Sequence, residues 1–207
     1  GKQYSKNLTR LTAVLRGDYQ CYIELALQYL NSGLYQEACD VLELANENKI
    51  NDRALIDYYH GYIRYLMKQV DKAKQLFALG RQHSVDNIFP FRLETIEVLK
   101  KAIEIDKNDA AACYYLGLVY AGIAELDSAN SYWQKAVNLN PKNGRAWRCL
   151  GLSHFTFFDQ EQDLPQARAC YQKAFEILPE DSRILLEFDQ VKERLGEDPK
   201  ERLAFLK

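Results

Sequence analysis

The feature that most constrains the fold of this chain is a pattern that recurs about every 34 residues. Its opening consists of a large or apolar residue, a leucine, a glycine and an aromatic residue or histidine. It occurs at Cys113, Leu116, Gly117 and Tyr120, and again at Trp147, Leu150, Gly151 and His154. A fixed period of this length marks a repeat architecture in which each unit packs only against its neighbours.

The second half of each unit places small and aromatic residues at helical spacing. The two clearest sets are Ala129, Trp133, Ala136 and Pro141, followed by Ala167, Tyr171, Ala174 and Pro179. Together, the two halves resemble a tetratricopeptide (TPR) repeat, whose first helix opens W-x2-L-G-x2-Y. The resemblance implies an all-α fold, a right-handed α-solenoid of antiparallel helix pairs.

The spacing predicts a single superhelical domain over residues 1–207. Its units are 18–52, 53–86, a half unit at 91–108, 109–143 and 144–181, followed by C-terminal helices in 182–207. We expect an irregular joint near 84–91, because turn-forming residues precede Pro90, which suits the first position of a helix. Ala136 follows Ala102 by 34 residues, so the helix after the joint is predicted to be the second helix of a unit lacking its first.

The fourth unit departs once from the pattern. Gly151 and Ala167 are sixteen residues apart, whereas the matching Gly117 and Ala129 are twelve apart. We therefore expect a longer turn around residues 157–163.

Composition argues against several classes of function. The chain has 27 Lys and Arg against 29 Asp and Glu, so we expect no nucleic-acid partner. No run approaches the ~18 apolar residues of a membrane span, so no membrane partner is expected either. Five cysteines without a C-x2-C pair favour free thiols in a reducing compartment such as the cytoplasm, with a redox role as the alternative. The chain opens without methionine, and we read it as excised from a longer protein.

A narrower resemblance rests on three strings. These are Phe89-Pro90-Phe91-Arg92-Leu93-Glu94, Leu186-Glu187-Phe188-Asp189-Gln190 and Glu201-Arg202-Leu203-Ala204-Phe205-Leu206. With the stretched turn, they are similar to the C-terminal TPR region of a family of large bacterial proteins. That family carries an N-terminal β-rich domain similar to sugar mutarotases. The resemblance implies the scaffold half of a carbohydrate-associated protein.

Residues with catalytic chemistry are scattered. His60 and His154 stand at interface positions of first helices and are expected to pack, whereas His83 is expected to be solvated. No phosphate-binding loop, nucleophile motif or clustered metal ligands appear. We therefore expect no cofactor, no metal and no enzymatic activity.

The remaining candidate is the concave face formed by the first helices. The residues predicted to line a partner-binding groove there are Tyr58, Tyr62, Tyr65, Tyr114, Leu118, Arg145, Arg148 and Phe155. Tyrosine and arginine are enriched in binding hot spots, although tyrosines at helical spacing also pack in cores. The groove predicts a protein-interaction scaffold that binds a peptide or another domain of the same protein. The alternative is a non-catalytic or substrate-lining module of a carbohydrate-processing enzyme.

The two ends carry apolar helices that a solenoid would normally cap. Leu8, Leu11 and Leu15 lie at one end, and Leu203, Phe205 and Leu206 at the other. We expect weak homo-association through these ends.

Overall fold

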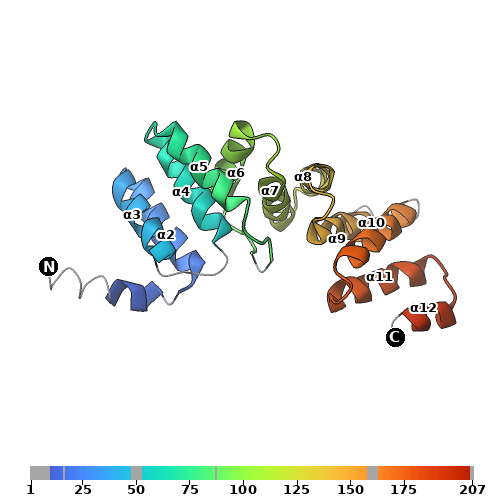
Figure 1. The fold of residues 1–207 in the computed structure, drawn as a ribbon. Helices are drawn as coiled ribbons and strands as arrows, with labels where there is room; N and C mark the ends of the chain where they lie inside the picture. The colour runs from blue at the N-terminus through green and yellow to red at the C-terminus, as the bar shows by residue number, and fades with distance from the viewer. Residues whose placement is uncertain (1–9, 16, 48–52, 87, 158–162, 206–207) are drawn as a thin grey trace. The chain divides into compact units, whose positions relative to one another are not determined.

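The computed structural model describes residues 10–15, 17–47, 53–86, 88–157 and 163–205. These residues form helices joined by turns and loops, and no strand occurs among them (Figure 1). The predicted all-α class is therefore confirmed. The helices group into two compact units, residues 1–107 and 108–207. The single superhelical domain stays a prediction.

The first unit begins with helical residues 10–15. Five complete helices follow: α2 (Tyr19–Asn31), α3 (Tyr35–Glu47), α4 (Ala54–Leu66), α5 (Val70–Gly80) and α6 (Glu94–Ile105). The second unit contains α7 (Ala110–Gly122), α8 (Leu126–Leu139), α9 (Gly144–Leu152), α10 (Leu164–Ile177), α11 (Ser182–Arg194) and α12 (Pro199–Phe205). A π-helical turn, Ser153–Phe157, extends α9. Residues 158–162, which form most of the predicted longer turn, lie outside the described residues.

Short turns make consecutive helices antiparallel. Three residues separate the helices in the pairs α2/α3, α4/α5 and α7/α8, and the middle residue has a positive φ in each turn. That residue is Gly33 in the first turn, but Lys68 (φ 64°) and Ala124 (φ 61°) in the other two. A side chain in this left-handed region is strained, so the turn geometry is imposed by the packing of the paired helices.

The paired helices approach most closely at the predicted glycines. A Cβ atom added to Gly117 would lie 2.4 Å from Nε1 of Trp133, and one added to Gly151 would lie 2.9 Å from the ring of Tyr171. Facing alanines in the second helices are fully buried, as at Ala129. Only a small residue fits where one helix packs against an aromatic ring of its partner. The repeat frame read from the sequence is thus correct at these positions.

The expected irregular joint is present but longer than predicted. Helix α5 ends at Gly80 and α6 begins at Glu94, so residues 81–93 connect them. Pro90 lies within this connection and not at the first position of a helix, which corrects that part of the prediction.

Helix α6 lies parallel to α4. The hydroxyl of Tyr59 is 2.7 Å from Oγ1 of Thr95, and Nζ of Lys101 lies 4.6 Å above the ring of Tyr65. Both chains advance six residues between these contacts, so they run in the same direction. First helices of successive units run parallel, whereas a second helix runs against a first. Helix α6 therefore occupies the place of a first helix, and its predicted assignment as a second helix is wrong.

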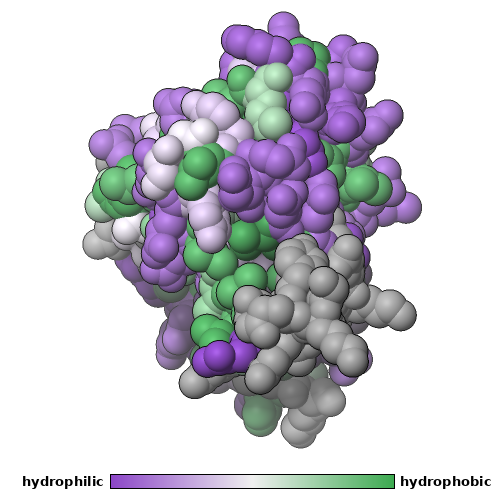
Figure 2. All heavy atoms as spheres, turned by 90° about the vertical axis from the view of Figure 1, so that its left-hand side faces the viewer, coloured by the Kyte–Doolittle hydropathy of each residue, from purple (hydrophilic) through white to green (hydrophobic). Residues whose placement is uncertain are grey.

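Apolar side chains are exposed toward the N-terminal side. Leu15 is buried, but Val14 is 71% exposed. Figure 2 shows this side of the molecule, with hydrophobic residues visible between hydrophilic ones. At the C-terminal end, Leu203 is 56% exposed, while Leu8 and Leu206 lie outside the described residues. Self-association through the ends stays a prediction.

The cysteine thiols are free, and four of the five are buried. Burial raises the pKa of Cys39, Cys113 and Cys170 to about 11, and that of Cys149 to about 12. These four thiols stay protonated at neutral pH, the form in which a cysteine is a poor nucleophile.

Among the described helices, none is both long enough and apolar enough to cross a bilayer.

Candidate functional site

Two of the predicted groove tyrosines belong to the core. Tyr58 is fully buried, and its ring lies 6.2 Å from that of Phe77. Tyr114 is 3% exposed and its ring lies 5.5 Å from that of Tyr115. Because neither ring reaches the surface, the prediction that these two residues line a groove is wrong. The alternative considered for tyrosines at helical spacing, packing between helices, holds for them.

Tyr62 and Tyr65, by contrast, are half-buried on the side of α4 that meets α6. Burial, followed by the nearby carboxylate of Glu97, raises the pKa of Tyr62, while Lys101 lowers it. Tyr35, which begins α3 and is 40% exposed, also acts on Tyr62. We call Tyr35, Tyr62, Tyr65, Glu97 and Lys101 the tyrosine face. The raised pKa keeps the Tyr62 phenol protonated, so it can donate a hydrogen bond.

Lys101 is held in place on the tyrosine face. Its ammonium lies 4.6 Å from the centre of the Tyr65 ring, a cation–π contact, and is paired with Glu104. The hydrogen bond to Glu104 raises the pKa of Lys101, so the residue is charged at neutral pH. The tyrosine face therefore combines ring surfaces, phenol donors, one ammonium and the carboxylate of Glu97. Lys101 and Glu97 lie on α6, which the sequence analysis assigned as the second helix of a unit.

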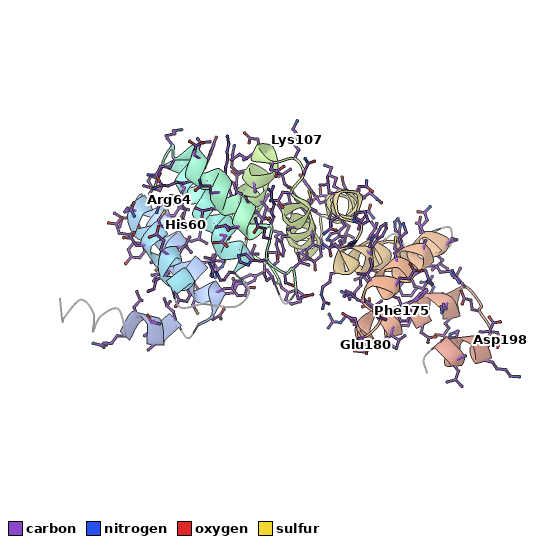
Figure 3. All side chains as sticks on the ribbon, viewed as in Figure 1. His60, Arg64, Lys107, Phe175, Glu180 and Asp198 are labelled. Atoms are coloured by element: carbon purple, nitrogen blue, oxygen red, sulfur yellow. The ribbon has the colours of Figure 1, made fainter. Side chains whose placement is uncertain are left out.

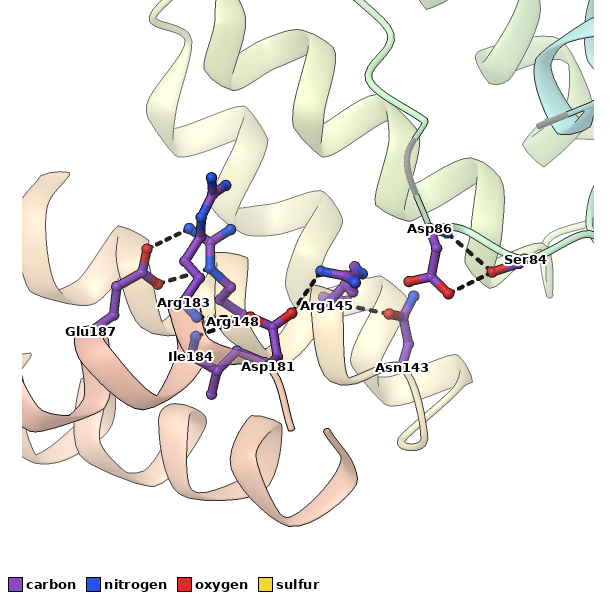
Figure 4. A network of polar contacts seen from close by, with 10 residues as sticks. Ser84, Asp86, Asn143, Arg145, Arg148, Asp181, Arg183, Ile184 and Glu187 are labelled. Carbon is purple, nitrogen blue, oxygen red and sulfur yellow. Dashed lines mark hydrogen bonds and ion pairs between the residues drawn. The ribbon is translucent and has the colours of Figure 1, made fainter. Parts of the chain in front are cut away.

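In the second unit, the predicted groove arginines pair with the carboxylates of Glu187 on α11 and of Asp181, which caps that helix (Figure 4). Nε of Arg148 donates to Oε2 of Glu187 at 2.8 Å, and the Tyr171 hydroxyl donates to the same oxygen at 3.1 Å. Arg145 donates to Asp181 at 2.9 Å. These partners stand 36 and 39 residues after the arginines, about one repeat later, and that spacing could have revealed them.

The last two predicted groove residues also lie in the second unit. Phe155 is half-buried, packs against the core around Tyr171 and Phe188, and has the guanidinium of Arg194 5.4 Å from its ring centre. Leu118 is half-buried on α7. The polar side chains predicted for a groove in this unit are thus joined to neighbouring helices.

A buried polar network fills the unusual positions of the first unit. Arg64 donates to Nε2 of His60 at 3.0 Å and to Glu43 at 2.6 Å, and it also reaches Gln69 at 3.3 Å. His60 and Arg64 lie side by side on α4 (Figure 3). Burial and the Arg64 charge lower the pKa of His60 to about 4, so its ring is neutral and accepts the hydrogen bond. The expected packing role of His60 fits this arrangement.

Asp57 and His83 form a second polar contact in this unit. Nε2 of His83 is 2.8 Å from Oδ2 of Asp57, whose side chain is 1% exposed. The His83 side chain is 34% exposed, so it is partly solvated as expected, and its contact with Asp57 also ties the segment after α5 to α4. Burial raises the pKa of Asp57, and the hydrogen bond with His83 lowers it. Across the described residues, no group of three or more His, Cys, Asp or Glu side chains could hold a metal.

Parts of the chain are similar to known proteins. The family described as the SusR N-terminal TPR domain matches residues 8–84. The chain therefore contains tetratricopeptide (TPR) repeats. The TPR protein is 35% identical over 113 residues to the cell division cycle protein 27 homolog of Caenorhabditis elegans, covering 55% of this chain and 13% of that protein.

A second relative and two solved structures are also similar to this chain. Anaphase-promoting complex subunit 3 of Schizosaccharomyces pombe is 25% identical over 126 residues, covering 55% of the TPR protein and 18% of the relative. The TPR protein thus spans less than a fifth of either relative. Among solved structures, a MamA RS-1 ArsTM double mutant is 20% identical, with 90% and 89% of the chains covered and a TM-score of 0.49. The first TPR of Spaghetti (RPAP3) bound to an HSP90 peptide has 18% identity, coverages of 71% and 96% and a TM-score of 0.47.

Proposed function

We propose that this TPR protein is a non-catalytic interaction scaffold that binds a protein or peptide partner through the tyrosine face of its first unit. The observation that carries the proposal is a contrast between predicted groove residues. Tyr62 and Tyr65 keep part of their rings at the surface, next to Glu97 and Lys101. Arg145 and Arg148 are already paired with carboxylates.

The chemistry of the tyrosine face suits a peptide. Tyrosine supplies a large contact area at low entropic cost, and its hydroxyl can donate to a backbone carbonyl. Glu97 can pair with a basic side chain of a bound peptide, whereas the ammonium of Lys101 is already paired with Glu104. An aromatic centre with a polar rim is the usual anatomy of a small interface.

The names of the relatives are in keeping with a role in protein assembly. The fission yeast relative is called a subunit of a complex.

The partner bound at the tyrosine face can also be a second domain of the same protein, such as the β-rich domain of the bacterial proteins that the sequence resembles. A partner in the same chain would face a high effective concentration of the site.

Peptide selection followed by calorimetry tests the proposal. Peptides selected from a random library against the protein are titrated into the wild type, the double variant Tyr62→Ala/Tyr65→Ala and the matched control Tyr120→Ala. Tyr120 is also a half-buried helical tyrosine, but it lies in the second unit. We expect the double variant to bind at least about tenfold more weakly, a difference of ~1.4 kcal/mol, and the control to bind normally. Equal affinity in all three proteins would refute the assignment.

Calorimetric titration with simple sugars tests the carbohydrate alternative. Tyrosine rings also stack on sugars, so a module that lines a sugar site would bind simple sugars saturably, and Tyr62→Ala would abolish that binding. The scaffold proposal expects no saturable heat with simple sugars.

A further inference from the structure

A second surface of the first unit is built by residues 88–93, just before α6. Burial alternates along this segment: Ile88 and Pro90 are buried, whereas Phe89, Phe91 and Leu93 are 62%, 64% and 60% exposed. We call these three exposed side chains the apolar ridge. Large apolar side chains gathered on one surface segment commonly mark an interaction site.

The apolar ridge is held in a fixed position. Ile88 and Pro90 are buried and so fix the segment to the rest of the unit. The ring of Pro90 also restricts its backbone to a single φ. Arg92 donates to Oε2 of Glu24 on α2 at 3.3 Å, and its guanidinium lies 5.1 Å from the ring centre of Phe91. A surface that is already ordered loses little conformational entropy when a partner binds.

The charges around the ridge are mostly negative. Asp86 and Glu94 flank the segment in sequence, and Glu24 approaches it through Arg92, the only cation between residues 86 and 94. The Glu24 side chain is 59% exposed, and Glu94 is also exposed. An apolar surface with an acidic surround complements a partner that carries both apolar and basic side chains.

The size of the ridge favours a short segment over a second copy of the chain. Three side chains exposed to this degree offer roughly 300–400 Å². A stable protein dimer buries ~800 Å² on each partner. We propose that the apolar ridge is a docking site for a short segment of another protein in which large apolar residues alternate with lysine or arginine.

Fluorescence anisotropy with two designed peptides tests this proposal. One labelled probe alternates leucine with lysine over about ten residues, and its match alternates leucine with glutamate. We expect the leucine–lysine peptide to bind at least about tenfold more tightly than the leucine–glutamate peptide. Phe89→Ser and Phe91→Ser should each weaken that binding about tenfold or more. Leu186→Ser is the control, because Leu186 is 58% exposed on α11 in the second unit.

Several outcomes would overturn the proposal. They are failure of the leucine–lysine peptide to bind, equal binding of both peptides, or equal loss with Leu186→Ser and Phe91→Ser. If Phe91→Ser instead abolishes a dimer seen by sedimentation, the occupant is a second copy. The double variant Tyr62→Ala/Tyr65→Ala should bind the leucine–lysine peptide normally, which separates this site from the tyrosine face.

Discussion

The two units place their buried polar residues differently. In the first unit, Asp57, His60 and Arg64 are buried in the interior of α4, at positions where the repeat normally has apolar or aromatic residues. In the second unit, Asp109 and Asn143 are buried as caps that accept hydrogen bonds from the first turns of α7 and α9, while Ser153 and Lys192 are buried within helical segments. Caps satisfy backbone donors that every helix leaves open, whereas the α4 network replaces apolar packing.

The charged surface residues differ in the same way. The second unit pairs Arg145 and Arg148 with carboxylates one repeat later, so its charges join consecutive repeats. The first unit instead exposes the tyrosine face and the apolar ridge. The irregular features of the first unit thus fall into two groups. The polar residues of α4 are buried, whereas the tyrosine face and the apolar ridge reach the surface.

The largest effect that we expect concerns close packing in the second unit. Gly117→Ala would place a Cβ 2.4 Å from Trp133, so the indole or the helix must move. We expect a loss of about 3 kcal/mol in the free energy of unfolding, measured with urea. Gly122→Ala is a control in the same helix, because its Cβ would meet nothing within 4 Å. A similar change in both variants would show that the helices do not cross where the structure places them.

A smaller effect is expected from the buried network of the first unit. The folded pKa of His60 is lowered from 6.5 to about 4, so its contribution is complete above pH 6.5 and is lost as pH falls toward 4. Between pH 6.5 and 4.5, the loss is about 2 kcal/mol. His60→Gln keeps an acceptor for Arg64 without titrating, so it should lose that much less stability over the same range. Parallel pH profiles for the wild type and His60→Gln would contradict the buried neutral ring.

The smallest effect concerns the turns between paired helices. Ala124 has φ 61°, a strained conformation for which a non-glycine residue pays about 1 kcal/mol. We expect Ala124→Gly to stabilise the protein by somewhat less than this, since glycine also loses more entropy on folding. The reciprocal change, Gly33→Ala, should destabilise. Thermal unfolding measures both, and shifts in the same direction would argue against a shared turn.

Much of the fold could be predicted because its determinants are local and periodic. Gly117 and Ala129 face their partner helix wherever the period places them, and Asp109 caps a helix as its position suggests. The direction of α6 could not be predicted, because it depends on the contacts of Tyr59 and Tyr65 with residues 36 positions away. Periodicity shows that a helix exists, but not which neighbour it lies against.

The candidate site was predicted in part. Tyr62 and Tyr58 both lie on α4, but Tyr62 is half-buried and Tyr58 is fully buried. The sequence does not show this difference, because exposure depends on which neighbouring helix each ring meets. The pairing of Arg148 with Glu187 was missed because the interaction spans two repeats. Repeat spacing applied to charges as well as apolar residues would have suggested it.

Hydrogen–deuterium exchange with and without a selected peptide tests the central claim most directly. If the first unit carries the recognition surface, the peptide will slow exchange in the second half of α4 and in α6, where Tyr62, Tyr65, Glu97 and Lys101 lie. Exchange in α9 and α11 should remain unchanged. Protection confined to α9 and α11, with α4 and α6 unaffected, would contradict the account and move the binding site to the arginines of the second unit.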